Sequence, residues 1–113
     1  MASAYTAGFH SIAYVTAPSE EVAKTIARGL LGKKLAACIN IIPKITSLYE
    51  WNGTVNEDSE VLMVIKSRSS RLDDLTKFVR ENHPYDVCEV ISTPITTGNH
   101  AYLDWISEIV PEK

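Results

Sequence analysis

The sequence predicts an α+β fold in the order βαββαβ, closed by a further C-terminal helix. Two helical patterns each follow a strand-like segment, the pair Asn52-Gly53 joins two long strand-like segments, and a third helical pattern ends the chain. This order is the ferredoxin-like split βαβ arrangement. Right-handed crossovers then place the first two helices on one face of an antiparallel sheet. The length fits one domain over residues 1–113, of which we expect 1–8 to be a flexible N-terminus.

The first strand is predicted over residues 9–16, where apolar side chains stand among small ones. A helix follows at once. Ser19 is a typical N-cap, and the two glutamates after it place negative charge in the first turn, which the helix dipole favours. Apolar residues recur at helical spacing up to Leu31, and Gly32 stands where a C′ glycine is expected.

The longest predicted feature is a hairpin from Leu35 to Lys66, with Asn52-Gly53 as a type I′ turn at its tip. About fourteen extended residues, from Cys38 to Trp51, reach about 46 Å, whereas a compact chain of this size has a radius of gyration of about 13 Å. This arm must bend at Pro43, project, or do both. Pro43 lacks a backbone donor and so indicates an edge strand or a bulge. A projecting arm exposes strand edges and apolar side chains, so we predict an obligate oligomer.

After the hairpin, Ser70 and Asp73 form a weak capping box for a second helix, which ends before Pro84. A last strand is predicted from Glu89 to Thr97, with Pro94 again at an edge or a bulge.

A third helix is predicted over residues 100–110, capped by Gly98-Asn99. Helical spacing places four large apolar residues on one face of it: Tyr102, Trp105, Ile106 and Ile109.

The bulk composition narrows the function. A net charge of -3 argues against sequence-independent binding of nucleic acid, which needs clustered Lys and Arg. No apolar run is long enough to span a membrane, and the first residues do not form a signal peptide. We expect a cytoplasmic protein without direct membrane insertion, although a processed precursor with an upstream targeting segment would present the same N-terminus. Cys38 and Cys88 have no CxxC spacing and are interpreted as buried thiols.

The residues that could carry chemistry are few. The sequence contains no nucleophile elbow, HExxH motif or P-loop, so we predict no enzymatic activity and no catalytic residues. His83 is the best candidate metal ligand, because it lies at a helix end near Tyr85 and Glu89, and Glu89 is the candidate second ligand. The alternative is that the His83 ring has a structural role at the helix C-terminus. His10 and His100 are weaker candidates.

A second set of residues is predicted to line a cleft between subunits, suited to a small anionic or metal-chelating ligand. The alternative is that its aromatic members are interface core, where Tyr and Trp are enriched. The set consists of Tyr49, Trp51, Lys66, Tyr85, Tyr102 and Trp105.

Several segments together resemble the divalent-cation tolerance protein family, CutA, in its animal form. The resemblance runs from about Ile12 to Ile109, and the segments that carry it are LAACINIIPKITSLYEWNG from Leu35, EVLMVIK from Glu60, HPY from His83 with the later Glu89, and YLDWI from Tyr102. Together these motifs are highly specific.

The resemblance implies a tight homotrimer in which the long hairpins of neighbouring subunits pair. It also implies a role in tolerance of copper and other divalent cations, with weak binding of Cu²⁺ or Zn²⁺ and no obligatory cofactor. Some bacterial relatives carry Cys and His where this chain has Val15 and Asn82, so two candidate ligands are missing here. Two alternatives stay open: a trimeric small-ligand sensor of PII-like architecture, and a scaffold that anchors or traffics a membrane-associated esterase.

Overall fold

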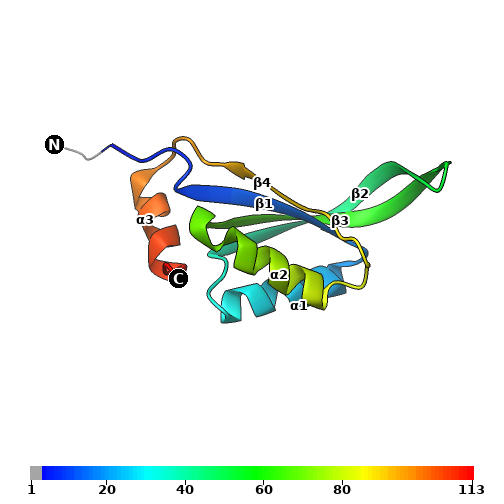
Figure 1. Cartoon of the computed structure of the whole chain (residues 1–113), viewed down its shortest axis with the longest axis horizontal. Coiled ribbons are helices and arrows are strands. Elements are labelled where there is room, and N and C mark those ends of the chain that lie inside the picture. The colour runs from blue at the N-terminus through cyan, green and yellow to red at the C-terminus, as the bar shows by residue number, and fades with distance from the viewer. Residues whose placement is uncertain (1–3) are drawn as a thin grey trace.

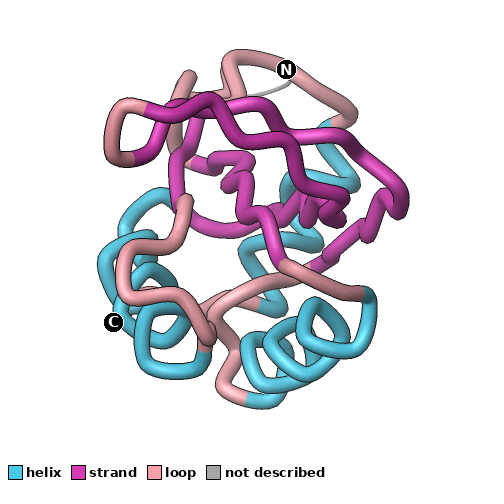
Figure 2. The backbone as a smooth tube through the Cα atoms, turned by 90° about the vertical axis from the view of Figure 1, so that its right-hand side faces the viewer, coloured by secondary structure: helices cyan, strands magenta, loops and turns pink. Residues whose placement is uncertain are grey.

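A computed structural model describes residues 4–113 and shows a four-stranded antiparallel sheet with α1 and α2 packed against one face (Figures 1 and 2). The strand order is β2-β3-β1-β4, so β2 and β4 are the edges. This is the ferredoxin-like arrangement that the sequence predicted. The elements are β1 (His10–Ala17), α1 (Glu20–Gly32), β2 (Cys38–Trp51), β3 (Thr54–Arg68), the 3-10 turn η1 (Ser69–Arg71), α2 (Leu72–Asn82), β4 (Val90–Pro94) and α3 (His100–Ile109).

The main core lies between the sheet and the two helices. Alternate residues of β1 and β3 point toward the helices, because successive side chains of a strand face opposite sides. Those residues are buried, and the apolar stripes of α1 and α2 that meet them are buried or half-buried. A second, smaller core joins α3 to the end of the sheet opposite the arm, and it consists of Ala37, Leu103, Ile106 and Val110.

The predicted projecting arm is present. β2 pairs with β3 from Cys38↔Lys66 to Trp51↔Thr54, and the chain extends 56 Å along its longest axis, with a radius of gyration of 15.2 Å. Asn52 and Gly53 both have positive φ, at 53° and 76°, which confirms the type I′ turn. The ladder shifts register between Ile42 and Ile45, so the Pro43 prediction is confirmed as a bulge on an edge strand.

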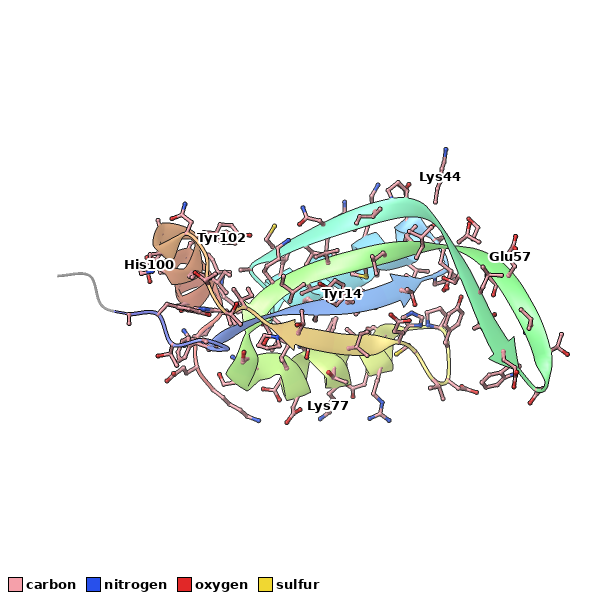
Figure 3. The ribbon with its side chains drawn as sticks, turned by 90° about the horizontal axis from the view of Figure 1, so that it is seen from above. Tyr14, Lys44, Glu57, Lys77, His100 and Tyr102 are labelled. Atoms are coloured by element: carbon pink, nitrogen blue, oxygen red, sulfur yellow. The ribbon has the colours of Figure 1, made fainter. Side chains whose placement is uncertain are left out.

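The face of the sheet that turns away from α1 and α2 is largely uncovered by this chain. Figure 3 looks onto this open face, with Tyr14 near its middle. Six apolar residues of the four strands form it by alternation, and none of them is fully buried: Ile12, Tyr14, Ile42, Leu62, Val64 and Ile91. Soluble monomers rarely expose a contiguous apolar patch of this kind.

The predicted glycine cap of α1 is wrong. Gly32 is the last helical residue, and the left-handed C′ residue is Lys34, with φ of 59°. The Lys34 N–H donates to the Leu31 carbonyl at 3.1 Å, and the Leu35 N–H donates to the Leu30 carbonyl at 2.9 Å. These two bonds make a Schellman motif. Leu35 therefore belongs to the helix cap, and for this reason β2 begins at Cys38 rather than at Leu35.

The starts of the other two helices differ from each other in how well they were predicted. Asn99 caps α3 as expected, its side chain accepting from the Ala101 N–H at 3.1 Å. The capping box of α2 is wrong, because Ser70 lies inside η1 and the N-cap is Arg71, which makes no side-chain capping bond.

Three further expectations are corrected. β4 ends at Pro94 rather than Thr97, because its partner β1 begins at His10, whose carbonyl accepts from the Ile95 N–H at 2.9 Å. Cys38 and Cys88 are half-buried rather than buried. The inward face of α3 consists of Leu103, Ile106 and Val110, and Tyr102 and Trp105 point outward.

The single-domain prediction and the flexible N-terminus stay predictions. Residues 1–3 of the predicted flexible segment lie outside the described residues, and Tyr5 is half-buried against the second core. Across residues 4–113, none of the helices is long and apolar enough to cross a membrane.

Candidate functional site

His83 ends α2, and both of its ring nitrogens are already hydrogen-bonded to backbone. Nε2 lies 2.8 Å from the Thr16 carbonyl, and Nδ1 lies 3.1 Å from the Tyr85 N. A carbonyl only accepts and an N–H only donates, so the ring is neutral and carries its proton on Nε2. The side chain is 8% exposed. In this arrangement His83 offers no lone pair to a metal ion, which favours the structural role over the predicted ligand role.

Glu89 does not complete a metal site with His83 in a single chain. Its side chain is exposed, in the segment before β4. Within residues 4–113, no three His, Cys, Asp or Glu side chains gather closely enough to hold a metal ion. Metal binding by His83 and Glu89 stays a prediction, and it requires a rearrangement that frees a ring nitrogen of His83 together with further ligands from another chain.

Two tyrosine–carboxylate pairs lie along the arm, one at its root beside Glu60 and one farther out between Tyr49 and Asp58. The Tyr85 hydroxyl donates to Glu60 Oε2 at 3.3 Å, and the Tyr49 hydroxyl donates to Asp58 Oδ2. The hydrogen bond to Asp58 raises the pKa of Tyr49, because the bond is lost when the phenol ionises. Burial, followed by the Glu60 charge, raises the pKa of Tyr85. Both phenols therefore stay neutral near pH 7.

Lys66, Tyr102 and Trp105 form a separate group at the other end of the sheet. Lys66 Nζ donates to the Asn40 side-chain oxygen. The Tyr102 ring lies 5.4 Å from the Trp105 ring, and burial and a hydrogen bond with the Cys38 thiol raise the pKa of Tyr102. Cys38 is directly opposite Lys66 in the β2–β3 ladder, which joins these residues into one surface.

The six predicted cleft residues thus divide into two groups, and one chain does not bring them together. Six positions of β3, about 20 Å, separate Glu60 beside Tyr85 from Lys66. Trp51 lies still farther out, at the arm tip, and is 62% exposed. In Figure 3, Tyr102 lies at the end of the molecule opposite Glu57 of the arm. A single cleft from all six residues needs the arm of one copy to reach the α3 end of another.

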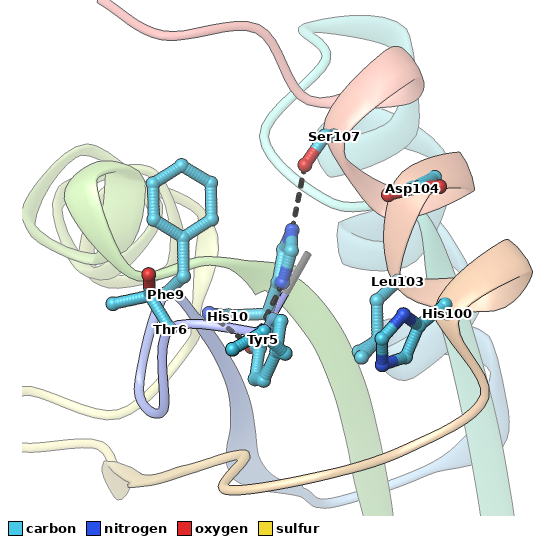
Figure 4. Close-up of a pocket in the computed structure, with 9 residues that line it drawn as sticks. Tyr5, Thr6, Phe9, His10, His100, Leu103, Asp104 and Ser107 are labelled. Atoms are coloured by element: carbon cyan, nitrogen blue, oxygen red, sulfur yellow. Dashed lines mark hydrogen bonds between the residues drawn. The ribbon is translucent and has the colours of Figure 1, made fainter. Parts of the chain in front are cut away.

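The surface of residues 4–113 contains the two cavities described below. One, of about 380 Å³, lies between the start of α1 and the end of α2, and His83 and Pro84 contribute to its wall together with Glu21, Val22, Thr25, Glu81 and Asn82. The other, of about 230 Å³, lies between the N-terminal segment and α3 (Figure 4). It is lined by Ala4, Tyr5, Thr6, Phe9, His10, His100, Leu103, Asp104 and Ser107.

The sequence reasoning missed the polar cluster in the second cavity. His10 is 3% exposed and joins Tyr5 to Ser107, which lies 97 positions away along the chain. The available signal was a histidine at the start of a strand, preceded by an aromatic residue five positions earlier. That signal is weak, because nothing in the sequence pairs His10 with Ser107.

The comparisons with known proteins agree with one another. The family model described as "CutA1 divalent ion tolerance protein" matches residues 11–109. A CutA homolog of Xenopus laevis is 60% identical over 96% of this chain and 72% of its own length. Human CutA is 55% identical over 95% of this chain and 60% of its own length. The chain therefore spans less than two thirds of the human relative.

Solved structures give the same result. A crystal structure of CutA1 from Oryza sativa superposes with a TM-score of 0.90 at 47% identity, over 92% of this chain and 95% of that one. A divalent cation tolerance protein from Thermus thermophilus gives 0.88 at 44% identity, over 90% of this chain and 99% of that one.

Proposed function

This chain belongs to the CutA1 family of divalent ion tolerance proteins, and from that premise we propose that it acts in tolerance of divalent cations, copper included, as a non-enzymatic homotrimer. The observation that carries the proposal is the open face of the sheet together with the arm. Ile91 is 59% exposed on that face, and Leu48 and Val55 are 66% and 71% exposed on the arm. Surfaces of this kind are interfaces in stable oligomers.

Three copies is the number that the family resemblance implies. In a trimer, each arm extends beyond its own domain and pairs with a neighbour, so the exposed edge of β2 is covered. The same contact brings the tyrosine–carboxylate pairs of one copy toward the Lys66 group of the next. The physiological compartment and an esterase partner stay predictions.

Metal binding in this proposal is weak, because the described part of one chain offers no three-ligand site. We expect micromolar affinity or poorer for Cu²⁺ or Zn²⁺, equivalent to about 8 kcal/mol or less. Binding by an imidazole falls below about pH 6, because protonation of a ring with a reference pKa of about 6.5 removes the lone pair.

Calorimetric titration with Cu²⁺ and Zn²⁺ tests the proposal on three proteins: wild type, His83→Ala and the control His100→Ala, whose side chain is exposed. Saturable binding that weakens in His83→Ala alone supports His83 as a ligand. Equal binding by all three proteins removes His83 from the site but leaves metal binding in place. No saturable binding by wild type at millimolar metal contradicts the metal-binding part of the proposal.

A small-ligand sensor is the second candidate, and the Lys66 group favours it. Lys66 is a half-buried cation beside an amide and an aromatic pair, which suits a small anion with an apolar part. A thermal-shift screen with nucleotides and carboxylates distinguishes it from the first candidate. A stabilising ligand whose effect disappears in Lys66→Ala, and persists in Lys77→Ala on the exposed side of α2, supports the sensor.

A further inference from the structure

His10 lies where three separate parts of the chain meet. It is the first residue of β1, and its ring contacts Tyr5 of the N-terminal segment and Ser107 of α3 (Figure 4). Nδ1 is 2.9 Å from the Tyr5 hydroxyl, and Nε2 is 2.7 Å from the Ser107 hydroxyl. The Tyr5 and His10 rings also stack, with centroids 5.7 Å apart and an angle of 7° between their planes. The Tyr5 side chain also packs against the second core, which contains Leu103 and Ile106 of α3.

Both ring nitrogens of His10 and the hydroxyl group of Tyr5 are fully hydrogen-bonded only when the His10 ring is neutral. The Tyr5 oxygen accepts from the His10 backbone N–H at 3.0 Å, which leaves its own hydrogen to donate to Nδ1. Nε2 then carries the ring proton and donates it to Ser107. In the charged ring both nitrogens are donors, so Tyr5 must turn its hydroxyl hydrogen away and lose that bond.

The charges around His10 also oppose a second positive charge. Arg68 of β3 is buried beside it, donating from Nε to the Val110 carbonyl at 2.7 Å and from Nη2 to the Ser107 carbonyl at 3.0 Å. Arg68 thus already supplies the cation that the C-terminal end of α3 favours. On the α3 side, Asp104 attracts a charged ring and His100 lines the same cavity; Glu112, in the C-terminal tail, is paired with Arg68 at 3.4 Å.

Burial and the Arg68 charge together lower the pKa of His10, and the opposing attraction of Asp104 is the smallest contribution. A lowered pKa in the folded state means that the unfolded or opened chain binds the proton more readily. The contribution of His10 to docking is therefore complete above about pH 6.5 and is lost as the pH falls below that value, down to the folded pKa. The cavity next to the ring gives water and protons a route to it.

We propose that His10 is a pH-sensitive latch that holds the N-terminal segment and α3 against the sheet and releases them when its ring is protonated. The release is local, because the main core between the sheet and α1 and α2 contains none of these contacts. It moves Tyr102 away from Cys38, and it thereby opens one end of the surface around Lys66. The latch does not depend on metal binding.

Hydrogen exchange measured by mass spectrometry at pH 7.5 and pH 5.5, corrected for the intrinsic exchange rate, tests the latch on wild type, His10→Gln and His100→Gln. Glutamine keeps a donor toward Ser107 but does not titrate. We expect peptides of α3 in wild type and His100→Gln to lose protection at pH 5.5. The loss should not exceed tenfold for each unit by which the His10 pKa in the folded chain lies below its pKa in the opened chain. His10→Gln should show no such change, and peptides of β1 and β3 should stay protected in all three.

Loss of protection in His10→Gln equal to that of wild type would overturn the latch, and so would an equal loss in β1 and β3. NMR titration of the His10 imidazole in wild type is an independent test, because it measures the His10 pKa without any variant that has to fold. A His10 pKa below 6.5 with a concurrent shift of the Ser107 resonances supports the latch, and a pKa at or above 6.5 rejects it.

Discussion

The two faces of the sheet are built by the same strands, yet only one of them is completed within the chain. On the face under α1 and α2, Val15, Met63 and Ile65 are 0% exposed. On the open face, Ile42 and Ile91 are 45% and 59% exposed. Strand alternation supplies apolar residues to both sides, but the chain has two long helices and places both on one side. We therefore expect the open face to be covered by another copy of the chain.

Trp51→Ala should have the largest effect, and it distinguishes an arm that packs between copies from an arm that stays in solvent. If Trp51 packs between copies, its truncation should cost about 3 to 5 kcal/mol, as buried Trp truncations do. The single chain leaves Trp51 62% exposed, so the chain alone predicts a change within about 0.5 kcal/mol. Equilibrium denaturation of the assembled protein measures the difference, with the exposed Lys77→Ala as control. A small effect would place Trp51 in solvent and return it to the set of possible ligand contacts.

Met63→Ala and Val64→Ala compare the two faces at neighbouring positions of β3. Met63 is fully buried under the helices, so its truncation should cost about 2 to 5 kcal/mol. Val64 points to the open face, so Val64→Ala should mainly weaken association, which sedimentation at several protein concentrations detects. Equal loss of association in both variants would contradict the division of the sheet into a helix-covered face and an open face.

Gly29→Ala tests how closely α1 and α2 pack against each other on the helix-covered face. A Cβ at Gly29 would clash with Cζ of Phe78, where α1 meets α2. Overpacking of this kind costs about 1 to 3 kcal/mol. Gly32→Ala is the matched control, because nothing lies within 4 Å of its added Cβ, and alanine should leave stability equal or slightly higher. Thermal unfolding of both variants measures the difference. An unchanged stability of Gly29→Ala would show that the Phe78 ring can move aside without loss of packing.

The sequence was sufficient where the deciding contacts are local. The Asn52-Gly53 turn, the Ser19 cap and the bulge at Pro43 each depend on residues within a few positions, and all three were predicted correctly. The cap of α1 was predicted wrongly. Lys34 takes the left-handed position there, because two backbone hydrogen bonds offset the strain of a non-glycine residue.

The candidate site was harder to predict because its contacts are distant in sequence. His83 was expected near Tyr85, and the two rings do lie 4.8 Å apart. The partner that occupies its second nitrogen is the carbonyl of Thr16, 67 positions away, and no local pattern indicates it. Tyr102 and Trp105 were placed correctly on one side of α3, but helical spacing alone could not tell which apolar side packs inward.

We expect the open face and the arm to be covered by two further copies of this chain. Light scattering across nanomolar to micromolar concentration measures this directly, together with native mass spectrometry. We predict three times the 12.5 kDa mass of the chain at every concentration at which the protein stays folded. A folded, stable species of 12.5 kDa would contradict it.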